Sequence, residues 1–329
     1  MPSPLHEAGR PGASDRTTPG SPFPRGYQPP SHLRPVVKAA HRTLLVRPIA
    51  DALLDHVFAV ALALGGALAL LHLPLTIGVP SALVALVAIG RQLRALECLT
   101  HEASHYSFSR RQRLNDLLGQ VLAGLPTGAS LGDYRRSHRI HHTAFGTEAD
   151  PDLARYRELG IERLRRHSRV LFALDVLRRL PRYQRGWLAT VRSQPMVFAA
   201  PFGWAGLAVA LPVAAFDGFR AGLLTACLWL LAQFTSLPVI RFLGESEEHI
   251  YAGRYTVFDT TISNIGLRNL LLKHPHNDGY HTVHHMWPAI PYYRTRRLHE
   301  LLMKQDPEYA GRVVLGPPKT SSPDLPESE

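Results

Sequence analysis

The sequence predicts an all-α integral membrane protein, with four transmembrane helices in two hairpins beneath a cytoplasmic helical cap. Three observations predict this fold. Residues 57–90 contain no Asp, Glu, Lys or Arg, and further uncharged runs occupy 195–216 and 221–240. Each run, whole or divided in two, approaches or reaches the roughly 20 apolar residues that a membrane span needs. Closely spaced histidines lie in the polar segments that separate or follow these runs, which places them together in the cap.

Composition narrows the classes of protein further. The chain has 37 Lys and Arg against 26 Asp and Glu, and a basic chain suits either nucleic acid or an anionic membrane surface. Its two cysteines, Cys98 and Cys227, exclude a disulfide framework and a cysteine-rich zinc module. We expect residues 1–36 and 315–329 to be disordered tails, because they are rich in Pro, Ser and charge, and 37–314 to be the membrane domain.

Proline and glycine divide the apolar runs into helices. Pro74, Gly78 and Pro80 interrupt the first run near its middle, which predicts a hairpin with a tight turn there. Asp217 to Arg220 marks the turn of the second hairpin. The expected spans are 56–74, 78–96, 196–216 and 221–240.

The charge distribution predicts which side of the membrane the polar segments occupy. Residues 143–195, between the two hairpins, are dense in arginine, and the positive-inside rule assigns such segments to the cytoplasm. Each hairpin returns the chain to the side it left. We therefore expect both termini and every histidine-rich segment on the cytoplasmic side.

Three groups of histidines have the spacing of one helix face. Residues three or four apart on a helix are neighbours, so the imidazoles of each group converge. Eight or nine imidazoles exceed the three or four ligands of one zinc ion and suit two metal ions with four or five nitrogen ligands each. Iron, copper and zinc all fit this ligand type. The groups are His101 and His105; His138, His141 and His142; and His281, His284 and His285, with His249 as a ninth.

Several nearby residues are candidates for supporting roles. Asp150 and Asp152 either orient box histidines by accepting their second N–H or cap the helix that begins at Pro151. Asn277, four residues before His281, is a candidate second-shell or weak ligand. His274 and His276 are expected in a solvated loop.

The three groups, their order and their position around two hairpins resemble the membrane-bound fatty acid desaturase and hydroxylase superfamily. The resemblance covers roughly residues 40–312, and it extends beyond the histidines. Its parts are His101-Glu-Ala-Ser-His105, then Arg135-Arg-Ser-His138 with His141-His142 and Asp150-Pro-Asp152, then Glu248-His249, and finally Tyr280-His281-Thr-Val-His284-His285 with Pro291-Tyr-Tyr.

This resemblance implies a diiron centre that activates O2 with two electrons from an external donor and removes hydrogen from an unactivated C–H bond, with no separate acid or base. The sequence holds no His-Pro-Gly-Gly haem motif, so we expect a separate donor of the ferredoxin or cytochrome b5 type, with its reductase. The chain departs from the acyl-CoA desaturase branch at Glu245, where that branch has a water-linked Asn. A carboxylate here would act as a stronger ligand or proton acceptor.

The expected activity is desaturation of a fatty acyl chain or lipid, and hydroxylation of a lipid or natural product by the same superfamily is the alternative. A zinc-dependent membrane hydrolase would use one catalytic water and a base such as Glu102. A metal transporter would carry its ligands within the spans, which contain almost none. Nucleic-acid binding is supported by charge alone, and no recognition motif accompanies it.

Overall fold

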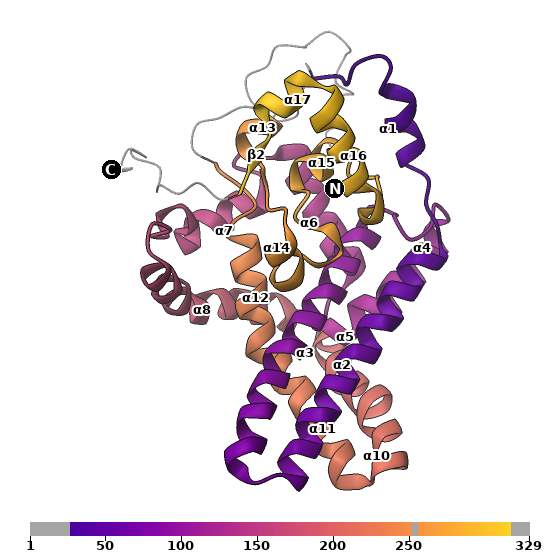
Figure 1. Ribbon diagram of the computed structural model, residues 1–329, viewed down its shortest axis with the longest axis vertical. Helices are drawn as coiled ribbons and strands as arrows, with labels where there is room; N and C mark the ends of the chain where they lie inside the picture. The colour runs from indigo at the N-terminus through magenta and orange to yellow at the C-terminus, as the bar shows by residue number, and fades with distance from the viewer. Residues whose placement is uncertain (1–26, 252–255, 317–329) are drawn as a thin grey trace, which may run out of the picture.

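The computed structural model describes residues 27–251 and 256–316, and these ranges are mostly helical (Figure 1). Four helical segments within them are long and apolar enough to span a membrane. The all-α membrane fold predicted from the sequence is therefore confirmed. The first two spans are α2 (Val46–His72) and α3 (Leu75–Ser104). The third, Pro195–Asp217, consists of α9 (Pro195–Trp204), the π-helical η3 (Ala205–Ala210) and α10 (Leu211–Asp217). The fourth, Phe219–Glu245, consists of α11 (Phe219–Phe234) and α12 (Ser236–Glu245).

The spans pack through small residues and present large apolar ones outward. Ala59, Ala63 and Ala67 recur on one face of α2 and are fully buried, whereas Phe58 is 54% exposed and suits a lipid environment. In lipid no hydrophobic effect drives helices together, so close backbone approach has to supply the packing. Gly90 illustrates this approach, because a Cβ atom there would lie only 2.8 Å from the Ser236 Cβ of α12.

The first hairpin turns more tightly than predicted. α2 ends at His72 and α3 already begins at Leu75, so Gly78 and Pro80 lie inside α3 instead of in the turn. Pro80 falls in the second turn of the helix, close to the end where proline is best tolerated. The turn is made by Leu73 and Pro74 alone.

Shorter helices form the cap at one end of the spans (Figure 1). Between the hairpins lie α4 (Gln112–Gly119), the π-helical η1 (Gln120–Gly124), α5 (Leu125–Thr127), α6 (Leu131–Ala144), α7 (Pro151–Leu159), the 3₁₀ turn η2 (Ile161–Arg163) and α8 (Arg169–Arg192). After the last span come α13 (Val257–Thr260), α14 (Leu267–Leu272), the 3₁₀ turn η4 (Pro275–Asn277), α15 (His281–Met286), α16 (Tyr292–Gln305) and α17 (Pro307–Arg312). Strand β1 (Ile262–Ser263) pairs in parallel with β2 (Val314–Leu315).

The cap has its own apolar core, and this core corrects the expected end of the N-terminal tail. Helix α1 (Arg34–Ala40) begins before residue 37, and Tyr27 is buried against Phe258 with a ring-centroid separation of 5.1 Å. The Tyr27 hydroxyl donates to Asp306 at 2.5 Å. Residues 27–36 are thus part of the cap, because they cover apolar side chains of its C-terminal helices; residues 1–26 lie outside the described part of the chain, as do residues 317–329.

Candidate metal centre

Four segments carry the nine histidines to the junction between the spans and the cap. His101 lies in the last turn of α3, and His105 is the residue that ends that helix. Helix α6 supplies three histidines, α15 supplies three more, and His249 follows shortly after α12. Helices α3, α6 and α15 thus position eight of the rings, and a bridge between the backbones of His249 and Thr261 positions the ninth.

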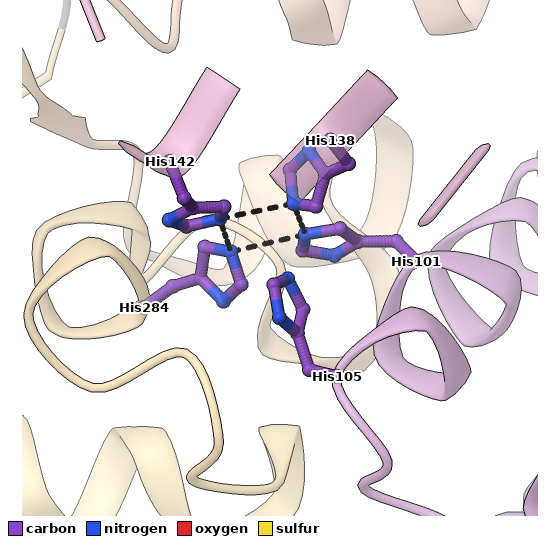
Figure 2. A group of neighbouring side chains, drawn as sticks. All are labelled: His101, His105, His138, His142 and His284. Atoms are coloured by element: carbon purple, nitrogen blue, oxygen red, sulfur yellow. Dashed lines mark hydrogen bonds between the residues drawn. The ribbon is translucent and has the colours of Figure 1, made fainter. Parts of the chain in front are cut away.

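Five imidazoles converge in the first group (Figure 2): His101, His105, His138, His142 and His284. One ring nitrogen from each lies within 4.8 Å of the corresponding nitrogens of the others. Four of the Nε2 atoms form a closed ring in which neighbours are 2.9–3.0 Å apart. The fifth, His105 Nε2, is buried and has no hydrogen-bond partner among the described residues.

Hydrogen bonding alone cannot satisfy this ring. A neutral imidazole nitrogen carries either a proton or a lone pair, so each contact needs one donor and one acceptor. Four nitrogens with two neighbours each offer at most two protons for four contacts if donors and acceptors alternate. Four or five lone pairs directed at one cation, in contrast, satisfy every nitrogen including that of His105. The residues present therefore fit a transition-metal ion.

The second group contains four imidazoles. His141, His249 and His285 place their ring nitrogens within 4.8 Å of one another. His281 joins them, because its Nε2 lies 2.9 Å from that of His249 and 3.1 Å from that of His285. The His142 and His285 rings stack at a centroid distance of 4.4 Å, so the two groups are adjacent. The structure brings all nine predicted histidines together in groups of five and four.

Burial keeps most of these rings neutral. It lowers the pKa of His105, His138, His142 and His284 well below the usual 6.5, and charge repulsion from neighbouring histidines lowers it further. The same causes lower the pKa of His249, His281 and His285 in the second group. A neutral imidazole has a free lone pair, so both groups are in the protonation state that binds metal near neutral pH.

His141 differs because two carboxylates face it. Its Nδ1 lies 3.0 Å from Asp150 Oδ1 and 3.4 Å from Asp152 Oδ2. Burial alone would lower the pKa of His141, but the charges of Asp152 and Asp150 outweigh it and raise that pKa. With Nδ1 engaged, Nε2 is left to face the second group. Asp150 also accepts from the Asp152 backbone N–H as the N-cap of α7, so it fills both of the roles that the sequence left open.

Two other predicted residues lie outside both groups. The Glu245 carboxylate accepts from the Tyr183 hydroxyl at 2.7 Å and lies 3.6 Å from the Arg155 guanidinium. The Asn277 side chain donates to the Tyr292 carbonyl at 3.1 Å, which fastens the turn before α15 to α16. Among the described residues, Glu245 belongs to none of the groups of His, Cys, Asp and Glu that could hold a metal ion.

The structure corrects the expectation for His274, and it adds a charged cluster that the sequence analysis missed. His274 is 1% exposed, with its Nδ1 3.3 Å from Asp278 and 3.6 Å from Glu248. Arg94 Nη2 lies 2.9 Å from Asp278 and 3.8 Å from Glu248, so its guanidinium already supplies the positive charge that these carboxylates require. Asp278 in turn lies 3.6 Å from His101 Nδ1. The cluster therefore places the Asp278 carboxylate behind the first histidine group.

A cavity of about 580 Å³ opens beside the histidines, a size within the usual range for small-molecule sites. Its lining includes five of the histidines, His101, His138, His141, His249 and His281. Residues of α7, α8 and α12 line it as well, as do Gly128, Gln194 and Val197, the last two beside the start of the third span. A molecule in this cavity would thus contact residues of both histidine groups.

Comparison with known proteins decides the family. The fatty acid desaturase family model matches residues 74–315, which include every histidine of the two groups. The chain belongs to the fatty acid desaturase family. Members of this family are diiron oxidoreductases, so the chain is a desaturase, and both the resemblance and the enzyme class predicted from the sequence are confirmed. Hydroxylation by the same superfamily is not favoured over desaturation.

Curated relatives in this family act on diverse substrates. The chain is 24% identical over 267 residues to a dihydrorhizobitoxine desaturase of Bradyrhizobium elkanii, covering 71% of this chain and 73% of the relative. It is 26% identical over 244 residues to a ferredoxin-dependent sn-1 acyl-lipid omega-3 desaturase of Nostoc sp., covering 67% of each. A shorter match of 68 residues, at 29% identity, links it to a Δ8-(E)-sphingolipid desaturase of Komagataella phaffii and covers 20% of this chain and 12% of the relative.

Proposed function

We propose that the nine histidines hold two iron ions and that the protein desaturates a lipid or related amphiphile with O2. His101, His105, His138, His142 and His284 would hold one iron, and His141, His249, His281 and His285 the other. The observation that carries this proposal is the closed ring of Nε2 atoms in the first group, which a bound cation satisfies and hydrogen bonds do not. Bound iron would supply the reductive activation of O2 that cleavage of an unactivated C–H bond requires.

The overall reaction fixes what the protein has to deliver. A –CH2–CH2– unit loses two hydrogen atoms and becomes –CH=CH–. O2 takes up those two hydrogens with their electrons, together with two electrons from a donor and two protons, and leaves as two water molecules. The protein contributes orientation of the substrate carbons and of the metal ligands, since the difficult chemistry belongs to the cofactor.

Neighbouring groups would fix the ligands for this task. Asp150 accepts from His141 Nδ1, Asp152 lies 3.4 Å from the same nitrogen, and the Thr260 carbonyl lies 3.3 Å from His249 Nδ1. Such partners hold an imidazole in one tautomer and raise its basicity as a ligand. Asp278 is the corresponding candidate for His101, because it is the carboxylate nearest to that Nδ1.

We propose further that the cap faces the cytoplasm and receives electrons from a ferredoxin-type protein. Helix α8 carries exposed arginines along its length, and these charges support docking of an acidic donor as well as the expected cytoplasmic orientation. The ferredoxin-dependent relative supports this donor over one of the cytochrome b5 type. The exposed arginines are Arg169, Arg178, Arg182, Arg185 and Arg192.

Expression in a lipid-producing host with ferredoxin and its reductase tests the proposal. We expect an O2-dependent product that is lighter than its substrate by two hydrogen atoms in mass spectra of the cell extract. The His141→Ala variant is the control, and it should lose both iron and product. A product heavier by one oxygen atom would instead indicate hydroxylation, and full activity of His141→Ala would remove that residue from the ligand set.

A further inference from the structure

The cavity beside the histidines also has a charged lining. Glu97, Arg155, Arg241 and Glu245 belong to it, together with the hydroxyl-bearing side chain of Tyr183. Moving these groups from water into contact with a hydrocarbon chain would cost free energy without any compensating hydrogen bond. The part of a substrate that lies beside these groups is therefore expected to be polar.

Most of these charges are already paired by short contacts. Arg241 Nη1 donates to Glu97 at 2.7 Å, and the Arg241 Nε donates to the Tyr183 hydroxyl at 2.9 Å. That hydroxyl donates to Glu245 at 2.7 Å. These groups form one continuous chain of hydrogen bonds that ties α8 to α3 and α12, and a ligand would have to break this chain to bind to it.

Arg155 also forms an ion pair, with Glu245, but its contacts are longer than those of the other charged groups. Its guanidinium lies 3.6 Å from the Glu245 carboxylate and 4.4 Å above the Tyr183 ring, and it donates no hydrogen bond to any described residue. Its side chain is 39% exposed and lines the cavity. An arginine supported on an aromatic face, whose N–H groups make no hydrogen bond, is preorganised to bind a carboxylate or phosphate through two parallel hydrogen bonds.

The position of Arg155 sets a distance to the candidate metal centre. It follows Asp152 by three residues on α7, so the two side chains are neighbours on one helix face, about 5–6 Å apart. Asp152 itself lies 3.4 Å from His141 Nδ1. An anionic group held by Arg155 would therefore lie close to the histidines, and only a few carbon–carbon bonds would separate it from the reacting carbons.

We propose that Arg155 binds the carboxylate or phosphate of an anionic amphiphile and that desaturation takes place near this head group, not in the middle of a long chain. This inference rests on the proposed function, because it uses the same cavity and the same reaction. It makes Arg155 a residue that determines the substrate class and the position of the double bond.

Binding of matched amphiphiles to the iron-loaded protein tests the substrate class. The probes are laurate, lauryl phosphate, lauryl alcohol and lauryltrimethylammonium, measured by calorimetry without O2 on the protein in lipid nanodiscs. They share one alkyl chain and differ in head group, so their comparison isolates the charge. Laurate or lauryl phosphate should bind about tenfold or more tightly than the alcohol, as expected for a charge-assisted hydrogen bond. The tighter of these two anions identifies the head group, and equal binding of the alcohol or the ammonium probe would overturn the proposal.

Substitutions separate recognition from folding. Arg155→Gln should lower the preference for the anion about tenfold and leave the iron content unchanged, and Arg155→Lys should restore part of the preference. Arg157→Gln is the matched control, because Arg157 lies on the same helix, is 60% exposed and pairs with Glu148 at 2.7 Å outside the cavity. Arg155→Gln with an unchanged preference, or Arg157→Gln with the same loss, would refute the role of Arg155.

The position of the double bond distinguishes failure of this inference from failure of the proposed function. A product with its double bond a few carbons from an anionic head supports both. A double bond in the middle of a long chain overturns the inference and leaves the desaturase function intact. Absence of iron, together with absence of any O2-dependent product, overturns the function itself.

Discussion

Asp150→Asn is the substitution that probes the support of the candidate metal centre most sharply. Asp150 and His141 are both buried, with side chains 0% and 1% exposed, and Oδ1 lies 3.0 Å from Nδ1. The carboxylate also accepts from the backbone N–H groups of Gly146 and Asp152. Asparagine is as good an N-cap as aspartate, so α7 should persist, but one carboxylate oxygen becomes an amide NH2 that cannot accept.

The expected loss has two parts. One buried backbone or imidazole N–H is left without an acceptor, which costs about 1–3 kcal/mol of folding stability. The pKa of His141 also falls, because one of the two carboxylates that raise it is gone, and the ring becomes a poorer ligand. Loss of such a partner typically lowers metal affinity about 10–100-fold. Retained iron is measured by plasma mass spectrometry after equilibration with a graded series of chelator concentrations.

The control is Asp306→Asn. Asp306 is also a buried N-cap carboxylate of the cap, and its partners are Tyr27 and the backbone N–H groups of Glu308 and Tyr309. This variant should lose similar stability and keep its affinity for iron. The reasoning is refuted if Asp150→Asn retains iron as the unsubstituted protein does, or if both variants lose iron equally.

Three further predictions concern pH, packing and orientation. The pKa of His138 and of most of the neighbouring histidines is lower in the folded protein than in the unfolded chain. Protons therefore bind the unfolded chain first as pH falls below about 6.5, so folding stability and iron loading should both decrease there. Iron retention that is unchanged down to about pH 5 would contradict this prediction. Gly90→Leu should destabilise the protein by about 1–3 kcal/mol or more, because the new side chain would overlap Ser236. Gly65→Leu is the control and should have little effect, because the space around Gly65 is open. Thermal unfolding of both variants in nanodiscs measures the difference. A cysteine introduced at Gly218, in the turn between α10 and α11 at the far end of the spans, should react with an impermeant thiol reagent only from the side opposite the cap, and reaction from the cytoplasm would reverse the proposed orientation.

The spans were predictable because the physical constraint on them is local. A segment that crosses a membrane must be apolar along its whole length, and this leaves a continuous trace in the sequence. The histidine groups were predictable for a similar reason, since helical spacing alone places the rings of each group on one face. Convergence of the groups required only that each should follow a span on the same side.

The charged surroundings of the histidines were not predictable in this way. Arg94 meets Asp278 across 184 positions of the chain, and His274 is buried only because these residues surround it. The sequence predicts a role at the metal centre for the neighbouring Asn277, because it precedes His281 by four residues, as on one helix face. Its backbone φ of +58° instead places Asn277 in a turn. Tyr27 is a parallel case in the cap, since its partners are supplied by the opposite end of the chain.

The central claim is that nine histidines in groups of five and four hold two iron ions. Metal analysis of the purified protein, expressed with iron and zinc both available, tests it most directly. We predict about two irons per chain, with the iron of the first group lost in His284→Ala and the iron of the second group lost in His285→Ala. One zinc ion per chain, or iron content that is insensitive to these substitutions, would contradict the account.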